Sequence, residues 1–547
     1  MKDLAENSPW PPRILLCLTV FISYASVWPN AFVFDDQYLI VFNSFLKSWS
    51  TFPRLLTSQN FAGGGIQGGF YRPVQMLVYF CVYQAFGAST IAFHALNVSL
   101  QALNACLLHH FGLRAGLKKG AAFAAALLWA VHPLHTLDVT YMSSTAELLW
   151  GSFCLLGLIA LLPDFAPQKV WKSLIFFILA LGCKESAVVF PALTMITFFY
   201  TSKDRTKIAA YFRIWPLWLL AAGYIIVWLL YIHNSGYNLD KSGSPMHSAD
   251  YTSSFINRLL TCLATLPVYA RLIIWPAGMH IERSFTPFFT LLAWQPMIGA
   301  LMAGLGLAQI FCGRAQQGLA LSFGLLWFAV ALAPYTSIVI PTDALISEGW
   351  MYLPTMGFFL GVAQTTAVIF EKKKNAARLL VTALAVSLGV ATFFQNQVWR
   401  NTETLYQNIV QNGGRSYQLS IPLGLFYMER GEFDKAVEQF QTALQHTVGR
   451  PKIREETHLR LAMAWLQVPL DERGGATLND VNRALPSCRH IPEAVAALGQ
   501  VLLDNPDFYW AHQALAVIYH YQGNSQMAAF HEKQAEAILR KQRNQNR

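Results

Sequence analysis

Charged residues are scarce in this chain of 547 residues, since Asp, Glu, Lys and Arg together make up 13% of it. Soluble domains carry about 25% charged residues, so an ordinary soluble enzyme is excluded. Hydrophobic residues make up 54% and aromatic residues 14%, which also excludes a disordered chain, a collagen-like repeat and a small disulfide scaffold. These proportions indicate a polytopic membrane protein, because Trp and Tyr favour membrane interfaces.

The usual motifs of nucleotide and serine-hydrolase chemistry are missing. The glycine pairs and triplet within residues 63–69 lack a P-loop lysine, no Rossmann fingerprint opens a strand, and no G-x-S-x-G is present. Seven of the eight cysteines lie in or beside apolar segments, and only Cys488 lies in a polar region, so we expect no disulfide framework. The net charge of +10 arises largely from short basic clusters between apolar runs, which does not favour a nucleic-acid partner.

Apolar runs long enough to cross a bilayer fill the first part of the chain. We predict eleven spans, near residues 13–28, 91–111, 120–137, 146–162, 171–183, 186–201, 214–232, 291–312, 317–334, 351–370 and 377–394. The first span follows Arg13 without a small-residue cleavage site, so we expect an uncleaved anchor. Residues 73–87 are short for a crossing, and residues 255–276 contain Arg258, Pro267 and Arg271, which predicts a helix lying in the interface.

The positive-inside rule decides how these segments are oriented. With a cytoplasmic N-terminus and both ambiguous segments outside, 16 of the 24 Lys and Arg residues before residue 395 lie on short inner loops. The large outer loops are then residues 29–90 and 233–290. We therefore predict a membrane domain over residues 1–394, with the region that follows it on the outer, periplasmic or lumenal, side.

Residues 395–547 are polar and contain helical repeats. Small and aromatic residues in Tyr417–Leu444, among them Gly424 and Phe440, match the 34-residue tetratricopeptide pattern, and a second match runs through Leu515 to Ala535. Segments between them match less well, and a plain helical tail is the alternative. The predicted fold is thus all-α, with a polytopic membrane domain followed by a tetratricopeptide-like solenoid.

Polar residues next to the membrane gather on the outer face of this arrangement. The clusters are Asp35-Asp36, Tyr71-Arg72-Pro73, His132-Pro133-Leu134-His135, Lys184-Glu185, His280-Ile281-Glu282-Arg283 and Glu348. Ionisable residues at membrane depth are costly, so their gathering at one interface predicts a shared cavity.

Each cluster has a chemical and a structural interpretation. Repulsion between Asp35 and Asp36 under an apolar wall could raise one pKa toward the range of a general base, but the pair could equally cap a helix. Arg72 could clamp a phosphate or only reach toward the interface. Lys184-Glu185 is either an internal ion pair or a phosphate cation beside its partner, and Arg283 is similar.

Two histidines, His132 and His135, bracket a proline at the outer end of a span. Their spacing of three can place both rings on one face, which suits hydrogen bonds to a phosphate or half of a metal site. No third and fourth ligand completes a zinc signature, and a structural histidine pair is the alternative.

The motifs in this order resemble the transmembrane and tetratricopeptide repeat O-mannosyltransferase family. They are FDDQYLIVFN (34–43), YRPVQML (71–77), FHALNVSLQALNACLL (93–108), AVHPLHTLDV (130–139), CKE (183–185) and YLPTMGF (352–358). That family is grouped with the superfamily C glycosyltransferases, and the likeness covers nearly the whole chain, spans first and repeats after.

The resemblance implies a transferase that takes a sugar from a polyprenyl phosphate at the outer membrane face. It implies Asp35 as the base that activates a Ser or Thr hydroxyl of a protein, Asp36 as its partner, and inversion at the anomeric carbon. Arg72, His132, His135, Lys184 and Arg283 become candidates for holding the lipid phosphate. Tyr71, Glu185, Glu348 and Tyr352 lie in or beside the same motifs. A divalent metal ion is left open, as is the sugar.

One departure from the family pattern concerns the position before YLPTMGF. Many relatives have an acid-arginine pair there, whereas Glu348 is followed by Gly349 in this chain. The resemblance therefore leaves the donor open, and Arg283 or Lys184 could compensate for the missing arginine.

The few repeats, and a single N-x-S/T tripeptide inside a span, favour a bacterial inner membrane with a periplasmic tail over the ER membrane. The tail is expected to recruit the acceptor protein, because helical repeats present concave peptide-binding surfaces. Two other functions stay open. One is a lipid-linked oligosaccharide ligase or polymerase, and the other is a non-enzymatic membrane-anchored scaffold.

Overall fold

The computed structural model describes residues 10–65, 70–202, 204, 206, 211–234, 251, 253–281, 283, 285–313, 316–339, 342, 344–413, 417–445, 447, 451–468 and 477–545. Within these ranges the regular elements are helices and there is no strand, which confirms the all-α prediction. Several residues of the predictions lie outside the described residues: Gly68-Gly69, Glu282, the basic residues at 203, 205, 207 and 314, and all of 235–250, which belong to the predicted second outer loop.

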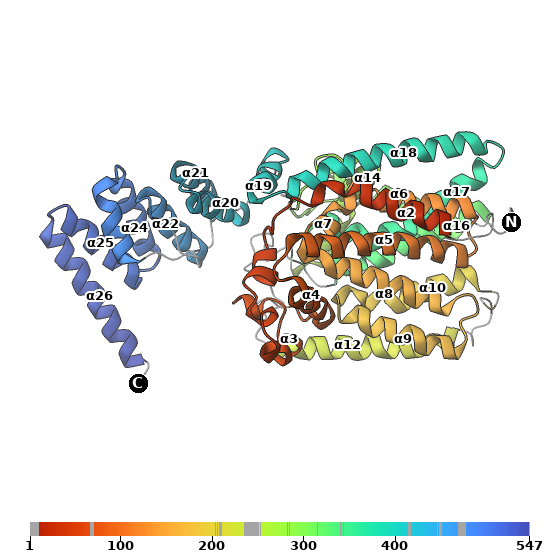
Figure 1. Ribbon diagram of the computed structural model, residues 1–547, viewed down its shortest axis with the longest axis horizontal. Coiled ribbons are helices and arrows are strands. Elements are labelled where there is room, and N and C mark those ends of the chain that lie inside the picture. Colours follow the sequence, from red (N-terminus) through yellow and green to blue (C-terminus); the bar gives the residue numbers. More distant parts are fainter. Residues whose placement is uncertain are drawn as a thin grey trace. The chain divides into compact units, whose positions relative to one another are not determined.

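The chain divides into two units, Met1–Thr404 and Leu405–Arg547 (Figure 1). Residues 395–404 are part of the first unit, although their polarity assigns them to the tail in the sequence. The reason is that α18 (Lys374–Gln395) continues into η12 (Asn396–Trp399), and η12 packs among the outer loops of the first unit.

The first unit is a bundle of helices, many of which run side by side in Figure 1. Its remaining longer helices are α2 (Trp10–Ser23), α3 (Phe52–Thr57), α4 (Pro73–Phe86), α5 (Thr90–Arg114), α6 (Lys119–Ala130), α7 (Thr136–Thr140), α8 (Thr145–Leu161), α9 (Pro167–Leu181), α10 (Phe190–Thr201), α12 (Trp215–Asn234), α14 (Phe255–Ile274), α15 (Trp294–Cys312), α16 (Gln316–Leu332) and α17 (Tyr352–Ile369).

Short helical turns lie between these helices of the first unit. They are η1 (Ala25–Val27), η2 (Gln37–Val41), η3 (Ser44–Leu46), η4 (Trp49–Thr51), η5 (Ala62–Gly64), η6 (Pro133–His135), η7 (Met142–Ser144), η8 (Glu185–Val189), η9 (Phe212–Ile214), η10 (Ala333–Tyr335) and η11 (Glu348–Met351).

Seven helices of the described residues are long and apolar enough to cross a membrane, and α6 with the bent segment Pro133–Thr140 makes an eighth. These eight correspond to eight of the eleven predicted spans. The other three fall on α2, α9 and α10, which are shorter helices. Residues 73–87 form α4, which is also too short to count as a span by itself. The chain is therefore an integral membrane protein, with seven or eight helices in its described part that are long and apolar enough to span a membrane.

Burial separates the central helices from the peripheral ones. In the segment Met142–Leu161, 72% of the residues are buried, against 11% in Trp294–Cys312 and in Lys374–Trp399. Apolar residues left exposed along α15 and α18 suit contact with lipid. Consequently α8 forms the centre of the bundle, and the end of α8 at which Glu147 lies can shield polar groups from lipid.

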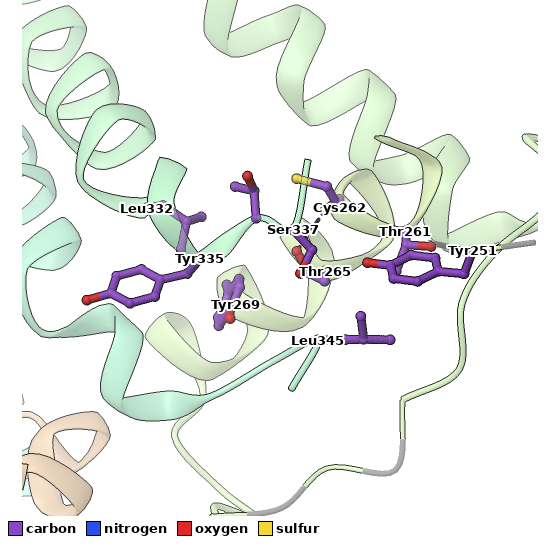
Figure 2. Close-up of a pocket in the computed structure, with 10 residues that line it drawn as sticks. Tyr251, Thr261, Cys262, Thr265, Tyr269, Leu332, Tyr335, Ser337 and Leu345 are labelled. Atoms are coloured by element: carbon purple, nitrogen blue, oxygen red, sulfur yellow. Dashed lines mark hydrogen bonds between the residues drawn. The ribbon is translucent and has the colours of Figure 1, made fainter. Parts of the chain in front are cut away.

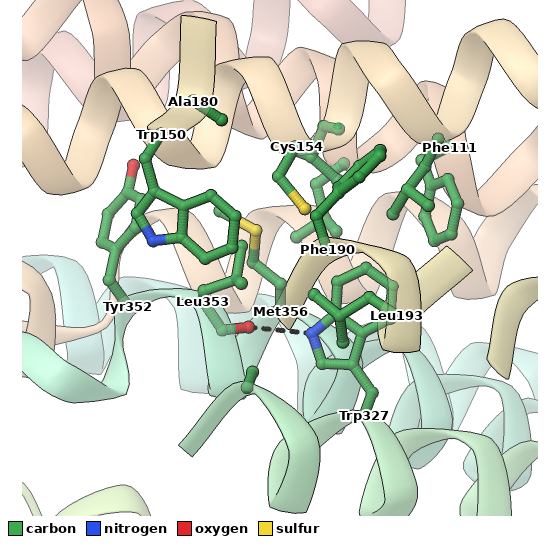
Figure 3. Packing of buried hydrophobic residues seen from close by; sticks show 14 of the residues in the cluster. Phe111, Trp150, Cys154, Ala180, Phe190, Leu193, Trp327, Tyr352, Leu353 and Met356 are labelled. Carbon is green, nitrogen blue, oxygen red and sulfur yellow. Dashed lines mark hydrogen bonds between the residues drawn. The ribbon is translucent and has the colours of Figure 1, made fainter. Parts of the chain in front are cut away.

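Large aromatic side chains fill the core around α8 (Figure 3). Trp150 and Trp327 are fully buried, and the indole N–H of Trp327 donates to the Leu353 carbonyl at 3.0 Å. Helices α16 and α17 approach closely at Gly324 and Gly361, where a Cβ on Gly324 would come within 3.1 Å of the Gly361 Cα. Small residues of this kind are what allow membrane helices to pack backbone against backbone.

Helix α14 contains most of residues 255–276, the segment predicted to lie in the membrane interface. Thr261, Thr265 and Tyr269 on one side are buried against the bundle, whereas Phe255 and Ile274 are more than half exposed. The helix is amphipathic, as Arg258 and Arg271 within an apolar run suggest.

The second unit consists of helices that pack in pairs. Gly424 and Phe440 of the tetratricopeptide match face each other, because a Cβ on Gly424 would lie 2.5 Å from the Phe440 ring. The elements are α19 (Thr402–Gln411), which begins in the first unit, α20 (Tyr417–Glu429), α21 (Phe433–Gln445), α22 (Pro451–Trp465), α23 (Leu478–Ala484), η13 (Leu485–Ser487), α24 (Ile491–Asp504), α25 (Tyr509–Tyr521) and α26 (Ser525–Gln545).

Candidate active site at the outer polar cluster

Asp35 and Asp36 lie in the loop between η1 and η2, and their environments differ. The Asp36 carboxylate is buried: one oxygen accepts from the Ser143 backbone N–H at 2.7 Å and from the Ser143 hydroxyl, and the other accepts from the Val33 N–H at 3.2 Å. Burial raises the pKa of Asp36 to about 7, and the repulsion from Asp35 is the smallest contribution to that rise. Asp36 makes no side-chain cap to η2, so the capping interpretation does not hold.

Asp35 is only partly buried, and within the described part of the chain its carboxylate takes part in no ion pair. Its backbone N–H donates to the Tyr141 hydroxyl at 3.1 Å. Burial raises the pKa of Asp35, while a hydrogen bond with Tyr141 and the charge of Arg72 oppose the rise. The residue before it, Phe34, has a φ of +53°, a conformation that non-glycine residues rarely adopt and that marks functional loops.

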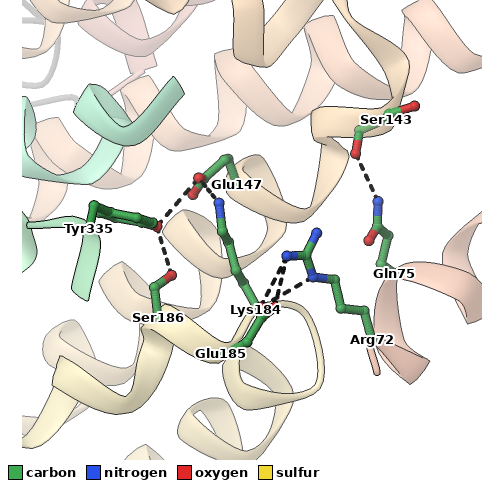
Figure 4. Close-up of polar contacts among 8 residues, drawn as sticks. All are labelled: Arg72, Gln75, Ser143, Glu147, Lys184, Glu185, Ser186 and Tyr335. Atoms are coloured by element: carbon green, nitrogen blue, oxygen red, sulfur yellow. Dashed lines mark hydrogen bonds and ion pairs between the residues drawn. The ribbon is translucent and has the colours of Figure 1, made fainter. Parts of the chain in front are cut away.

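Arg72 and Glu185 form a bidentate ion pair, the first of three at this end of the bundle (Figure 4). The Arg72 Nε donates to Glu185 at 3.2 Å, and the Arg72 Nη2 donates to both Glu185 oxygens at 2.9 and 3.1 Å. Arg72 ends the loop just before α4, and Phe70 lies against its guanidinium at 4.5 Å. A guanidinium has five N–H donors, so Arg72 still has Nη1 to offer a second anion.

Lys184 pairs with Glu147 rather than with its neighbour Glu185. The ammonium also lies 5.2 Å from the centre of the Tyr335 ring, and the Tyr335 hydroxyl donates to the Ser186 Oγ at 2.8 Å. Figure 4 shows how Lys184 and Glu185 point to different partners although they are adjacent in sequence. The hypothesis of an internal Lys184-Glu185 pair is thus replaced by two crosswise pairs that tie η8 to α8 and to the start of α4.

Arg283 and Glu348 form the third pair, and Glu348 also accepts from the His280 backbone N–H at 3.0 Å. Arg283 therefore provides the arginine partner that residue 349 lacks. A Cβ on Gly349 would lie 2.8 Å from an oxygen of Asp138, so a larger side chain at position 349 would press against that buried carboxylate.

The two histidines of the HPLH motif point into the protein interior. The His132 Nδ1 accepts from the Leu134 N–H at 3.2 Å, and the His132 Nε2 lies 2.9 Å from the Ile273 carbonyl, so both ring nitrogens are occupied. His135 is fully buried between Trp129 and Tyr352. This geometry fits the interpretation of His132 and His135 as a structural pair better than a role in binding phosphate or a metal ion.

Tyr71 and Tyr352 also hold structural contacts. The Tyr71 hydroxyl donates to the Leu56 carbonyl at 2.7 Å. Tyr352 is fully buried, where its hydroxyl donates to Gln101 at 2.6 Å and accepts from Asn104 at 2.8 Å. Tyr352 thereby joins α17 to α5 and lies outside the polar cluster.

Sequence reasoning missed Glu147, Asp138 and Tyr335. Glu147 and Asp138 are buried acids, and the charges of Glu147, Lys184 and Glu348 all act on Asp138, which links two of the ion pairs. The charge of Glu147 also acts on Arg72, which connects the third pair to the same electrostatic cluster. The available signal for Glu147 is a single acidic residue at the start of an otherwise apolar run. Nothing in the sequence around Tyr335 distinguishes it from other interfacial tyrosines.

A small pocket lies beside this cluster, between α14 and the turn that follows α16 (Figure 2). It is lined by Tyr251, Thr261, Cys262, Thr265, Tyr269, Leu332, Tyr335, Thr336, Ser337 and Leu345. Its volume of about 10 Å³ is that of roughly one water molecule, so no sugar ring fits in this conformation.

For the divalent metal ion that the resemblance leaves open, the described ranges contain no group of three or more His, Cys, Asp or Glu residues that could hold one.

Fold and site together define a polytopic helical membrane protein with a shielded cluster of acids and cations at one end of its bundle. Comparison with known proteins shows which proteins the chain resembles in sequence. The chain is 23% identical to protein O-mannosyl-transferase F38B6.6 of Caenorhabditis elegans, over 79% of this chain and 62% of that protein. It is 23% identical to protein O-mannosyl-transferase TMTC3 of Homo sapiens over 78% of this chain and 51% of that protein.

A shorter match has a higher identity: 33% to protein O-mannosyl-transferase TMTC1 of Mus musculus over 146 residues, which are 26% of this chain and 15% of that protein. These relatives confirm the resemblance stated from the motifs. The chain spans about half to three fifths of the length of the first relatives. No protein-family profile matches the chain, and no solved structure does.

Proposed function

We propose that this protein is a membrane glycosyltransferase that moves a sugar from a polyprenyl phosphate to a Ser or Thr hydroxyl of a protein at the outer membrane face. The observation that carries the proposal is the contrast between Asp35 and the other acids of the cluster. Glu147, Glu185 and Glu348 are each held in an ion pair, and Asp36 is buried and bound by Ser143 and Val33. Asp35, by contrast, is partly exposed, takes part in no ion pair among the described residues, and shares a hydrogen bond with Tyr141.

In this proposal Asp35 is the general base. It accepts the proton of the acceptor hydroxyl as the hydroxyl oxygen attacks the anomeric carbon, and the bond from that carbon to the phosphate oxygen breaks. Burial raises the pKa of Asp35, which strengthens it as a base, while a hydrogen bond with Tyr141 and the charge of Arg72 oppose that rise.

Arg72 and Lys184 are proposed to hold the departing lipid phosphate. Each is fixed by a glutamate and keeps N–H donors free of that glutamate, so an oxyanion can be bound without reorganising the cations. His132, His135 and Tyr352 act as structural supports, and Arg283 holds Glu348 in place of an arginine at residue 349.

The relatives named as protein O-mannosyl-transferases support a protein acceptor and a mannose-type reaction. We propose that the second unit recruits the acceptor protein through its helix pairs, and that the protein resides in a bacterial inner membrane with this unit in the periplasm.

The test uses the purified protein in nanodiscs with a panel of polyprenyl-phosphate monosaccharides, a periplasmic extract as acceptor, and release of polyprenyl phosphate as the readout. We expect one donor to be consumed, and Asp35→Asn to slow its turnover by about 10²–10⁴-fold, the usual contribution of a general base. Asp164→Asn is the matched control, because Asp164 is an exposed carboxylate paired with Lys169 in a different loop.

Wild-type turnover by a folded Asp35→Asn protein would refute the assignment of the base. If no donor is consumed with the extract present, the transferase proposal fails and the scaffold or ligase alternative takes its place.

A further inference from the structure

The last turn of the first unit, η12, lies directly against the loop that carries Asp35. The Ala31 backbone N–H donates to the Arg400 carbonyl at 2.9 Å, and the Asn30 side chain donates to the Asn396 carbonyl at 2.9 Å. Residues 30 and 31 precede Asp35 by only a few positions. The segment that leads toward the second unit is therefore hydrogen-bonded to the loop of the proposed base.

The same turn also contacts residues 140 and 141, and Tyr141 in turn contacts the loop that carries Asp35. The Thr140 hydroxyl donates to the Asn396 Oδ1 at 2.7 Å. The ring of Trp399, which is 3% exposed, stacks on the ring of Tyr141 with centres 5.2 Å apart and planes 23° apart.

Tyr141 completes the connection to the base. Its hydroxyl accepts from the Asp35 backbone N–H at 3.1 Å, and the Phe34 ring lies 6.4 Å from the Tyr141 ring. Phe34 has a φ of +53°, so the backbone just before Asp35 is held in a conformation that needs support from its surroundings. Tyr141 is thus fixed between the ring of Trp399 and the Phe34-Asp35 peptide.

We propose that η12 is the positioning element of Asp35, with Trp399 fixing Tyr141 and Tyr141 fixing the base. This inference rests on the proposed function and deepens it, because it assigns two positioning residues to the reaction. Since η12 is also the covalent route from the first unit to the repeats, the turn that orients the base is the one through which the two units are joined.

A displacement of about 1 Å at a reacting group can cost about 100-fold in rate. We therefore expect Trp399→Ala and Tyr141→Phe each to lower kcat for sugar transfer about 10-fold or more, with little change in KM for the donor. Trp399→Phe keeps a ring on Tyr141 and should restore most of kcat. The double variant should be no slower than the slower single variant, because both residues act along one path.

A second readout follows Asp35 itself, without any turnover. Carbodiimide modifies protonated carboxyls, so the pH dependence of Asp35 labelling, read by mass spectrometry, reports its pKa. The Tyr141 hydrogen bond lowers the pKa of Asp35, so its loss should move the labelling midpoint upward by about 0.5–1 pH unit in Tyr141→Phe and Trp399→Ala. Trp171→Ala, which removes a 59% exposed ring on α9, should leave the midpoint in place.

The outcomes separate this inference from the function on which it rests. A labelling midpoint that does not move in Tyr141→Phe, which removes only one oxygen, overturns the inference even if Trp399→Ala does not fold. Additive effects of the two substitutions on kcat would overturn it as well. If the midpoints move as expected while no donor is consumed by the wild type, the proposed function fails and the positioning of Asp35 by η12 is still supported.

Discussion

The ion pairs of the polar cluster in the first unit differ from the exposed pairs of the second unit. The three pairs of the polar cluster are enclosed, with side-chain exposures between 3% and 22%. In the second unit the pair of Lys541 and Asp507 is 61% and 60% exposed, and the pair of Arg540 and Glu536 is 80% and 71% exposed. Exposed pairs are screened by water and contribute little, whereas a buried charge that loses its partner is expensive.

This difference in exposure indicates that the enclosed pairs have a role besides stability. Replacing a buried pair by apolar residues is often neutral or stabilising, so stability alone gives little reason to keep charges there. Enclosed cations that retain free N–H donors are, however, suited to bind an incoming anion. Three substitutions, whose effects on stability should decrease in the order Glu147→Gln, Ser143→Ala and Asp507→Asn, test whether enclosed and exposed carboxylates contribute differently.

Glu147→Gln should have the largest effect on stability. It leaves the Lys184 ammonium buried without its carboxylate, which costs about 3–5 kcal/mol in the free energy of unfolding. Thermal unfolding of the detergent-solubilised protein measures the change, with Glu532→Gln, from an exposed pair, as the control. A fall in Tm no larger than that of the control would show that the outer pairs are as accessible to water as those of the repeats.

Ser143→Ala tests the buried carboxylate of Asp36, which is bound by neutral N–H and O–H donors rather than by a cation. The Asp36 pKa rises from 3.8 to about 7 in the folded state, so the folded protein binds a proton that the unfolded chain releases. Stability therefore falls as pH rises from about 4 to about 7, and it is flat above that window. Because the Ser143 hydroxyl favours the ionised form, its loss should cost about 1–2 kcal/mol at pH 8 and less at pH 5.

The measurement is the Tm of both proteins at the two pH values, with Ser50→Ala, an exposed serine, as the control. A loss that is greater at pH 5 than at pH 8 would reverse the sign and contradict an ionised Asp36 in the folded protein at high pH.

Asp507→Asn should have the smallest effect. It breaks the exposed pair with Lys541 in the second unit and should change the free energy of unfolding by about 0–1 kcal/mol. The change should vanish in high salt, which screens exposed charges. A loss of several kcal/mol would mean that the comparison between the two units does not hold.

The fold could be predicted largely from the sequence, because apolar run length and the tetratricopeptide spacing are local signals. Shorter helices such as α9 and α10 were located by their apolar character, although neither is long enough to count as a span. The boundary region 395–404 could not be assigned, because η12 is polar and its place in the first unit depends on hydrogen bonds to residues 30, 31 and 140.

The candidate site could be predicted only in part. Asp35, Arg72 and Lys184 were selected by their predicted position at the outer face. The charge of Arg72 acts on Asp35, and the charges of Arg72 and Lys184 both act on Glu185. The ion-pair partners of these residues could not be read from the sequence. Adjacency suggested a pair of Lys184 with Glu185, whereas the chain path at η8 directs the two side chains to different helices. Burial of His132 and His135 likewise depends on helices α14 and α17, which come much later in the sequence.

The crosswise pairing of Lys184 and Glu185 has a consequence for biosynthesis. Arg72 and Glu147 leave the ribosome long before residues 184 and 185 do, and an unpaired charge at membrane depth is costly. Until the tripeptide CKE has been made, Arg72 and Glu147 lack the partners that they have in the folded protein. The cluster is thus assembled in stages: residues 184 and 185 add two of its ion pairs to helices that were already made, and the third pair waits for Arg283 and Glu348.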